Sequence, residues 1–166
     1  MPWSLYAKRQ RTLFFYQRAK SFLGAAVLLQ RHGGGDQFVV LHLLCQGIEI
    51  LLKATLLMKN FDYFYPRLQK TYGHNLERLV RSTLREFQLH DMRSPLADEL
   101  AELNKLYSRH WLRYGSLFHD LLIDPNSINI RWVERRMIAA LRMIERELRR
   151  DVGLRNAGSR LHRLQR

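Results

Sequence analysis

The chain contains an arginine and a histidine whose spacing suits chemistry on phosphates: Arg113 and His119, with five residues between them. A histidine has an ordinary pKa of about 6.5, so it can accept or donate a proton at neutral pH. A neighbouring arginine can stabilise the charge that develops on phosphate oxygens. Because RNA can use its own 2′-hydroxyl as the nucleophile, such a pair is sufficient to cleave RNA without a metal ion.

The spacing alone does not select this pair. With 22 arginines and seven histidines in 166 residues, about three arginine–histidine pairs with four to six intervening residues are expected by chance. The chain has four such pairs: Arg67/His74, Arg85/His90, Arg113/His119 and Arg155/His162. Only position in the expected fold distinguishes the third, which follows the long helices.

Apolar residues recur at helical spacing in every long segment, and this pattern predicts an all-α fold, a five-helix, mostly antiparallel up-and-down bundle. We expect residues 1–153 to form one domain and residues 154–166 to be a basic, mobile tail. The expected helices are Ser4–Leu29, Gln37–Lys59 with Asp36 as its N-cap, one spanning Leu76 to Phe87, one from Ser94–Pro95 to Tyr107, and one from Ser127 to Gly153.

The long apolar helix expected at Gln37–Lys59 carries one acid and one base, Glu49 and Lys53, one turn apart. This spacing predicts an ion pair within the helix. His74 precedes the next expected helix, where His74 or Asn75 would satisfy the first backbone amides, and His74 is interpreted as a capping residue.

Three short motifs follow one another in this sequence and resemble the HEPN family of helical nucleotide-binding and RNA-cleaving domains. The resemblance spans about Tyr6 to Leu148. The motifs are Glu49-x-x-x-Lys53 in a long helix, Gly73-His74-Asn75-Leu76 at a helix start, and Leu103-Asn104-x-Leu106-Tyr107 leading to Arg113-Tyr114.

The resemblance implies a metal-independent endoribonuclease with Arg113 and His119 as catalytic residues, possessing no cofactor and no metal site. In that family two copies of the motif meet across a homodimer interface, and the domain often serves as a toxin paired with a nucleotidyltransferase-type antitoxin. The resemblance also implies that Glu49 and Lys53 border the cleft and order Arg113; as a plain buried ion pair they would instead be structural.

Three neighbours of Arg113 leave alternatives open. Arg109 and His110 either line the same groove for a nucleotide or nucleic acid or form the exposed end of a helix. Tyr114 stands where nuclease members of the family usually have a small polar residue. The alternative function is therefore a non-catalytic nucleotide- or RNA-binding module. A third possible function is an interaction scaffold.

Charge and cysteine content point to a cytoplasmic protein with an anionic partner. The formal net charge is +13, and both ends of the chain are basic while residues 32–130 are balanced. This favours RNA or a nucleotide as partner, or else solvated arginine faces. The single cysteine, Cys45, excludes a disulfide within the chain and fits a reducing cytoplasm. No membrane span is expected, because polar residues, Glu49 and Lys53 among them, interrupt the apolar helix.

Overall fold

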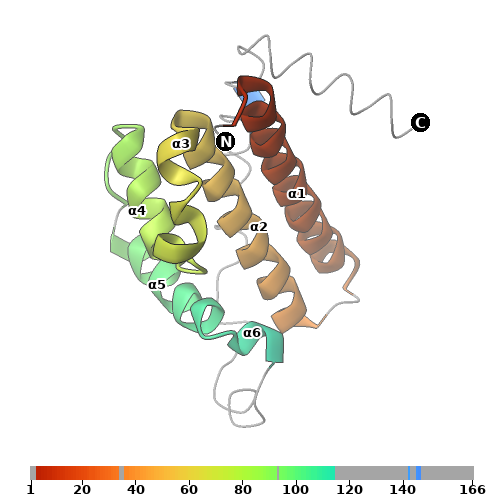
Figure 1. Cartoon of the computed structure of the whole chain (residues 1–166). Coiled ribbons are helices and arrows are strands. Elements are labelled where there is room, and N and C mark those ends of the chain that lie inside the picture. The colour runs from red at the N-terminus through yellow and green to blue at the C-terminus, as the bar shows by residue number, and fades with distance from the viewer. Residues whose placement is uncertain (1–2, 34–35, 93, 115–141, 143–144, 147–166) are drawn as a thin grey trace, which may run out of the picture.

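A computed structural model describes residues 3–33, 36–92, 94–114, 142 and 145–146, and it confirms the predicted all-α class. Figure 1 shows the helices arranged around α2, with no strand in these described ranges. The elements are α1 (Leu5–His32), α2 (Gln37–Lys59), α3 (Phe61–Phe64), the π-helix η1 (Leu68–Tyr72), α4 (Leu76–Glu86), α5 (Ser94–Ser108) and α6 (Trp111–Tyr114).

The first two helices form an antiparallel hairpin, side by side in Figure 1. Ser4 caps α1 by accepting a hydrogen bond from the backbone N–H of Ala7, at 3.2 Å. Gly33 ends α1 in the left-handed conformation, with φ of 64°, which glycine adopts at little cost. Asp36 is the N-cap of α2, as predicted, and its carboxylate accepts hydrogen bonds from the backbone N–H groups of Phe38 and Val39.

The helix α2 is the centre of the core, in contact with α1, α3, α4, α5 and α6. On the α1 side the two backbones approach closely at Gly47. A Cβ atom added there would lie 2.6 Å from Cγ of Leu23 and 3.1 Å from its backbone nitrogen. Glycine at position 47 therefore sets the distance between α1 and α2.

By length and composition α2 could also cross a membrane. In the structure, however, 78% of its most apolar window is buried inside the protein. A helix buried in this way is a core helix of the fold, and its apolar character needs no further explanation.

Two short helices between α2 and α4 were not predicted from the sequence, since one turn contains too few residues to display a period. Asn60 joins α2 to α3: its backbone N–H donates to the carbonyl of Leu56, and its side chain accepts from the backbone N–H of Tyr63. The π-helix η1 follows and ends at Gly73, whose φ is 51°. It brings the chain back across α2 before α4 begins.

The last described helices return the chain to the N-terminal half of α2 (Figure 1). The helix α5 begins at Ser94, as predicted, and ends at Ser108. His110 then adopts a left-handed conformation, with φ of 61°, and its N–H donates to the carbonyl of Tyr107. The one-turn helix α6 includes Arg113, in a stretch between Tyr107 and Ser127 where the sequence predicts no helix.

Within the predicted fifth helix, only residues 142, 145 and 146 are described, and each is helical. The carboxylate of Glu145 accepts hydrogen bonds from the hydroxyl of Tyr16, at 2.7 Å, and from Lys20, at 3.2 Å. These contacts connect that part of the chain to α1. The rest of the predicted helix, the predicted domain boundary at Gly153 and the basic tail lie outside the described residues.

Candidate functional site

The carboxylate of Glu49 is the centre of a hydrogen-bonded network on the side of α2 that faces away from α1. Its side chain is 4% exposed. One oxygen, Oε1, accepts from Nζ of Lys53 at 2.6 Å, which confirms the predicted ion pair within the helix. The other, Oε2, lies 2.8 Å from Nδ1 of His74 and 2.5 Å from the hydroxyl of Tyr107. Side chains from α2, from the turn before α4 and from α5 thus meet on one buried carboxylate.

Lys53 extends the network to the end of η1. Its ammonium group donates a second hydrogen bond, 2.7 Å long, to the backbone carbonyl of Gly73. The positive φ of Gly73 favours glycine at this position. The ammonium group of Lys53 thus lies between the carboxylate of Glu49 and the backbone carbonyl of Gly73.

His74 belongs to this network, and its interpretation as a helix cap is wrong. The cap of α4 is Asn75, whose side-chain oxygen accepts from the backbone N–H of Arg78 at 2.9 Å. The imidazole of His74 turns toward α2 instead, because Glu49 is a charged acceptor for its Nδ1–H. Because an ionised carboxylate can only accept hydrogen bonds, the proton in this contact belongs to Nδ1 of His74.

Asn104 holds α4 against α5 beside the same network. It is buried, its Oδ1 accepts from the backbone N–H of Leu76 at 2.8 Å, and its Nδ2 donates to Oε1 of Glu77 at 2.9 Å. The first of these bonds satisfies an amide at the start of α4 that has no partner within the helix. The relative position of α4 and α5 is therefore set by a specific polar contact.

Residues from the three sequence motifs accordingly meet in space. Glu49 and Lys53 come from α2, Gly73 and His74 precede α4, and Tyr107 comes from α5. Motifs that lie up to 58 residues apart in the chain form one continuous set of hydrogen bonds.

The network keeps Glu49 ionised. Burial, the largest single influence, raises the pKa of this carboxyl group, but the charge of Lys53 and hydrogen bonds from Lys53, Tyr107 and His74 lower it, and the net result is a pKa below the ordinary value. The nearby thiol of Cys45 behaves in the opposite way: burial, and then the charge of Glu49, raise its pKa far above the ordinary value. Cys45 is thus a buried, protonated thiol.

His110 lies against the network, whereas Arg109 points away from it. The rings of His74 and His110 meet edge to face, with centroids 5.1 Å apart. Arg109 is exposed, and its guanidinium group lies 5.0 Å from the centroid of the Trp111 ring. His110 therefore contacts the network through His74, whereas Arg109 lies at an exposed helix end; whether either lines a groove with Arg113 stays a prediction.

The remaining predicted site residues are located only in part. Arg113 and Tyr114 belong to the one-turn helix α6, which begins directly after His110 and contacts both α2 and α5. Their side chains, and the whole of His119, lie outside the described residues. The pairing of Arg113 with His119 stays a prediction.

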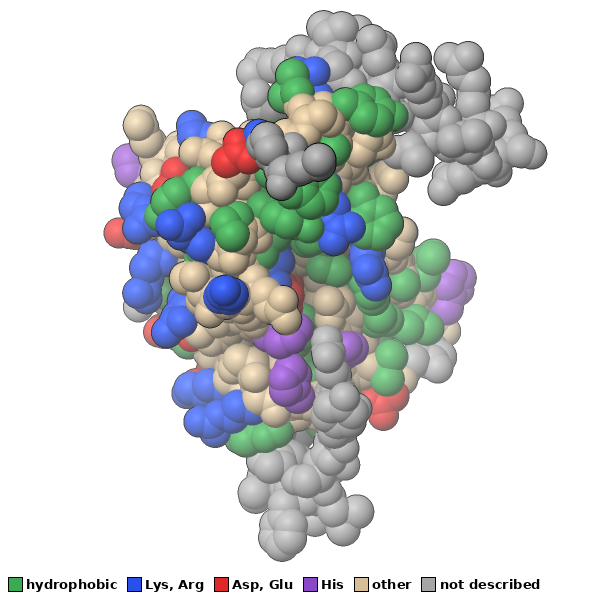
Figure 2. All heavy atoms as spheres, in the orientation of Figure 1, with side chains coloured by type: hydrophobic (Ala, Val, Ile, Leu, Met, Phe, Trp, Pro, Cys, Tyr) green, Lys and Arg blue, Asp and Glu red, His purple; other side chains and the backbone are tan. Residues whose placement is uncertain are grey.

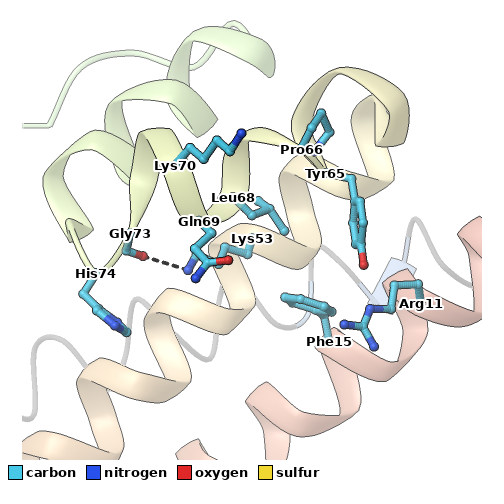
Figure 3. Close-up of a pocket in the computed structure, with 10 residues that line it drawn as sticks. All are labelled: Arg11, Phe15, Lys53, Tyr65, Pro66, Leu68, Gln69, Lys70, Gly73 and His74. Carbon is cyan, nitrogen blue, oxygen red and sulfur yellow. Dashed lines mark hydrogen bonds between the residues drawn. The ribbon is translucent and has the colours of Figure 1, made fainter.

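An open cleft of about 460 Å³ adjoins the network on the side of α1. Figure 3 shows its walls: α1 on one side, α2 as the floor, and the segment from α3 to the start of α4 on the other. Lys53, Gly73 and His74 are shared between the network and the cleft. The other lining residues are Arg11, Phe15, Tyr65, Pro66, Leu68, Gln69 and Lys70.

Exposed arginines form a stripe on α4. Arg78, Arg81 and Arg85 are spaced by three and four residues, on the face opposite the buried Leu79 and Thr83. Figure 2 shows Lys and Arg side chains gathered over the α4 side of the molecule, with histidine side chains nearer the middle of the same face. This surface has the charge that a phosphate backbone would contact.

Sequence reasoning missed Tyr107 and the true role of His74. The sequence identified Tyr107 as part of a motif at the end of a helix but predicted no contact for it, because periodicity does not report what a phenol hydroxyl contacts. The available signal was the buried Glu49 itself: two oxygens in a core need several donors, and Lys53 satisfies only one of them.

No family model matches this chain, and comparisons with curated proteins and with solved structures give no significant match. Among the described residues there is also no group of three or more His, Cys, Asp and Glu side chains that could hold a metal ion.

Proposed function

We propose that the chain is a HEPN-type helical domain that acts on RNA as a metal-independent endoribonuclease, with Arg113 and His119 as its catalytic residues. The observation that carries this proposal is the convergence of the three motifs on the carboxylate of Glu49. Their order in the sequence gave the resemblance, and a shared buried network is the physical reason for such motifs to occur together.

The network supports the proposal because it ends beside the helix that contains Arg113. His110 contacts His74, and α6 starts at the next residue. A residue other than glycine in the left-handed region costs about 1–2 kcal/mol. Such a conformation is maintained where the surroundings require it, and here it directs the chain from α5 into α6.

The chemistry follows from the two side chains. His119 would transfer protons to and from the 2′-hydroxyl and the leaving oxygen, and Arg113 would stabilise the charge on the phosphate. The exposed arginine stripe on α4 would hold the RNA backbone through its phosphates. Glu49, Lys53 and His74 would act as positioning residues, and the products would carry 2′,3′-cyclic phosphates.

Further parts of the proposal concern partners and location. We expect a homodimer in which two copies of the Arg113–His119 pair approach each other, a cytoplasmic location, and a role as the toxin of a toxin–antitoxin or defence pair with a nucleotidyltransferase-type antitoxin. Light scattering of the full chain at tens of micromolar would test the dimer, since a stable interface normally buries more than about 1,000 Å².

Cleavage of RNA by purified variants tests the activity. Arg113→Ala and His119→Ala should each lower the rate by about 10²–10⁴, and EDTA should have no effect. His90→Ala is the matched control, since His90 belongs to an arginine–histidine pair of similar spacing and lies exposed after the end of α4. Cleavage that persists in His119→Ala, or is lost equally in His90→Ala, would reject the catalytic pair.

The alternative is a non-catalytic nucleotide- or RNA-binding module, and Tyr114 favours it, because nuclease members of the family usually have a small polar residue at this position. Absence of cleavage by the wild type, combined with nucleotide binding that Arg113→Ala abolishes, would establish this alternative.

A further inference from the structure

The exposed apolar side chains are concentrated on α1 and on α3, whose Phe61 ring lies 5.6 Å from that of Trp3. Among the described residues, six of the eight large apolar side chains that are exposed belong to these two helices or directly precede α1: Trp3, Leu5, Tyr6, Phe14, Leu28 and Tyr63. Figure 2 shows hydrophobic side chains beside Lys and Arg side chains over this part of the molecule. Single exposed apolar residues are ordinary on a protein surface, whereas a group of them marks an interaction surface.

Five side chains on this face form a continuous series of contacts, which we call the aromatic–arginine ladder: Trp3, Tyr65, Arg11, Phe14 and Arg18. The ring centroids of Trp3 and Tyr65 are 5.1 Å apart. The guanidinium carbon of Arg11 lies 6.0 Å from the ring centroid of Tyr65 and 5.6 Å from that of Phe14. The guanidinium carbon of Arg18 lies 6.0 Å from the same Phe14 ring. Figure 3 shows Arg11 reaching from α1 toward Tyr65, so residues of two separate segments share one surface.

The charge on this face is basic. Residues 3–33 contain six lysines and arginines and no acid. The acid of α3, Asp62, is paired with Lys8 at 2.5 Å. Arg11 and Arg18 have no acidic partner among the described residues, and cation–π contacts engage the face of a guanidinium group. The N–H edges of these two arginines can therefore bind phosphate oxygens.

The packing of the rings favours a lipid surface over the bases of RNA. A base stacks on an open ring face. One face of Tyr65 is covered by Phe61, with centroids 4.8 Å apart and 12° between the ring planes, and the Phe14 ring is contacted by Arg11 and Arg18. At the boundary between lipid and water, aromatic rings are buried without stacking, and Trp and Tyr are enriched at that depth.

We propose that this face binds the surface of a membrane that contains anionic phospholipids. The rings of Trp3 and Phe14 insert at the boundary between headgroups and acyl chains, and Arg11 and Arg18 contact the lipid phosphates. The chain lies on the membrane through this face and does not cross it. A cytoplasmic protein meets anionic lipids at the cytoplasmic leaflet. The proposal concerns where the protein attaches, so it goes beyond the proposed function and does not depend on RNA cleavage.

Co-sedimentation of the full chain with vesicles of phosphatidylglycerol and phosphatidylcholine in equal parts tests the proposal. The protein should bind these vesicles, and should not bind vesicles of phosphatidylcholine alone. Trp3→Ala and Phe14→Ala should each weaken binding by about tenfold, since each removes a large apolar side chain from the lipid. Arg11→Gln should weaken binding by about fivefold, the usual contribution of one basic side chain near an anionic membrane surface.

Leu89→Ala and Arg31→Gln are the matched controls. Leu89 is 47% exposed, as Phe14 is, but follows the end of α4. Arg31 is exposed on α1, and its position 20 residues after Arg11 places it about 30 Å away along the helix. Both variants should bind the vesicles as the wild type does. All the substituted side chains are exposed, so the variants should fold, and far-UV circular dichroism checks this.

Vesicles with brominated acyl chains, which quench tryptophan fluorescence on contact, test the insertion of Trp3. The wild type should be quenched more strongly than Trp3→Phe, which keeps an apolar ring at this position and should still bind. Equal quenching of the two proteins would show that Trp3 stays in water and would overturn the proposal.

Three other results would also overturn it. Equal binding to vesicles of phosphatidylcholine alone would remove the role of the arginines. Equal losses in Arg31→Gln and Arg11→Gln, or in Leu89→Ala and Phe14→Ala, would reduce the binding to general attraction between a basic protein and an anionic surface. Loss of single-stranded RNA binding in Trp3→Ala, with vesicle binding unchanged, would assign the aromatic–arginine ladder to RNA.

Discussion

The two sides of α2 are stabilised in different ways. Toward α1 the contact is apolar and depends on small residues: Ala19 and Ala26 are fully buried, and Gly47 lets the backbone of Leu23 approach. Toward α4 and α5 the contact contains a buried carboxylate with three side-chain donors. Because a buried ion pair seldom adds net stability over an apolar contact of similar volume, the polar side is the one whose residues call for a functional explanation.

The largest effect on stability should come from removing the carboxylate. Glu49→Ala leaves the ammonium group of Lys53 buried beside Gly73 without its counter-charge, and we expect a loss of about 3–5 kcal/mol in the free energy of unfolding. Denaturant titration measures this. Glu102→Ala breaks an ion pair with Lys105 on the exposed face of α5 and should cost at most about 1 kcal/mol. Equal losses in the two variants would contradict the difference between buried and exposed pairs.

The stability of the apolar contact between α1 and α2 should be sensitive to added side-chain volume. Gly47→Ala places a methyl group against Leu23 and should cost about 1–3 kcal/mol, the usual cost of overpacking. Gly24→Ala, in α1, meets no atom within 4 Å and should stabilise the protein by about 0.5–1 kcal/mol, because alanine favours the helix. Thermal unfolding of both variants measures these two changes in stability, which should have opposite signs. Stabilisation by Gly47→Ala would show that α1 and α2 do not approach closely.

The stability that the polar side of α2 contributes should depend on pH. The pKa of Glu49 is lower in the folded chain than its ordinary value of 4.5, so the unfolded chain binds the proton more tightly. The ionised carboxylate therefore stabilises the fold at pH values above the ordinary pKa, and this contribution is lost as the pH falls through the folded pKa. Glu49→Gln lacks this contribution, so the difference in unfolding free energy between it and the wild type should shrink from about pH 5 downward. A constant difference would contradict the account.

A smaller effect should distinguish the cap of α4 from the network. Asn75→Ala removes the acceptor for the N–H of Arg78 and should cost about 1 kcal/mol. Hydrogen exchange at the amide of Arg78 should accelerate in this variant and stay unchanged in His74→Ala. Faster exchange in His74→Ala alone would restore His74 as the cap.

The helices with long apolar periods could be predicted from the sequence. So could Asp36 as the N-cap of α2 and the start of α5 at Ser94. The Glu49–Lys53 pair was also predictable, because both partners lie on one helix. The contacts of Glu49 with His74 and Tyr107 were not, since they join segments 25 and 58 residues away and depend on how η1 turns the chain. The cleft at Arg11 depends on the same turn, which no periodicity reveals.

The most direct test of the account compares RNA cleavage by Glu49→Gln and Gly47→Ala at a temperature at which both variants are folded. If the network positions the residues that follow His110, Glu49→Gln should lower the cleavage rate by about a hundredfold, the usual cost of misplacing a catalytic group by about 1 Å, while Gly47→Ala should cleave at nearly the wild-type rate. Cleavage by Glu49→Gln at the wild-type rate, or the same loss in both variants, would contradict a positioning role for the buried carboxylate.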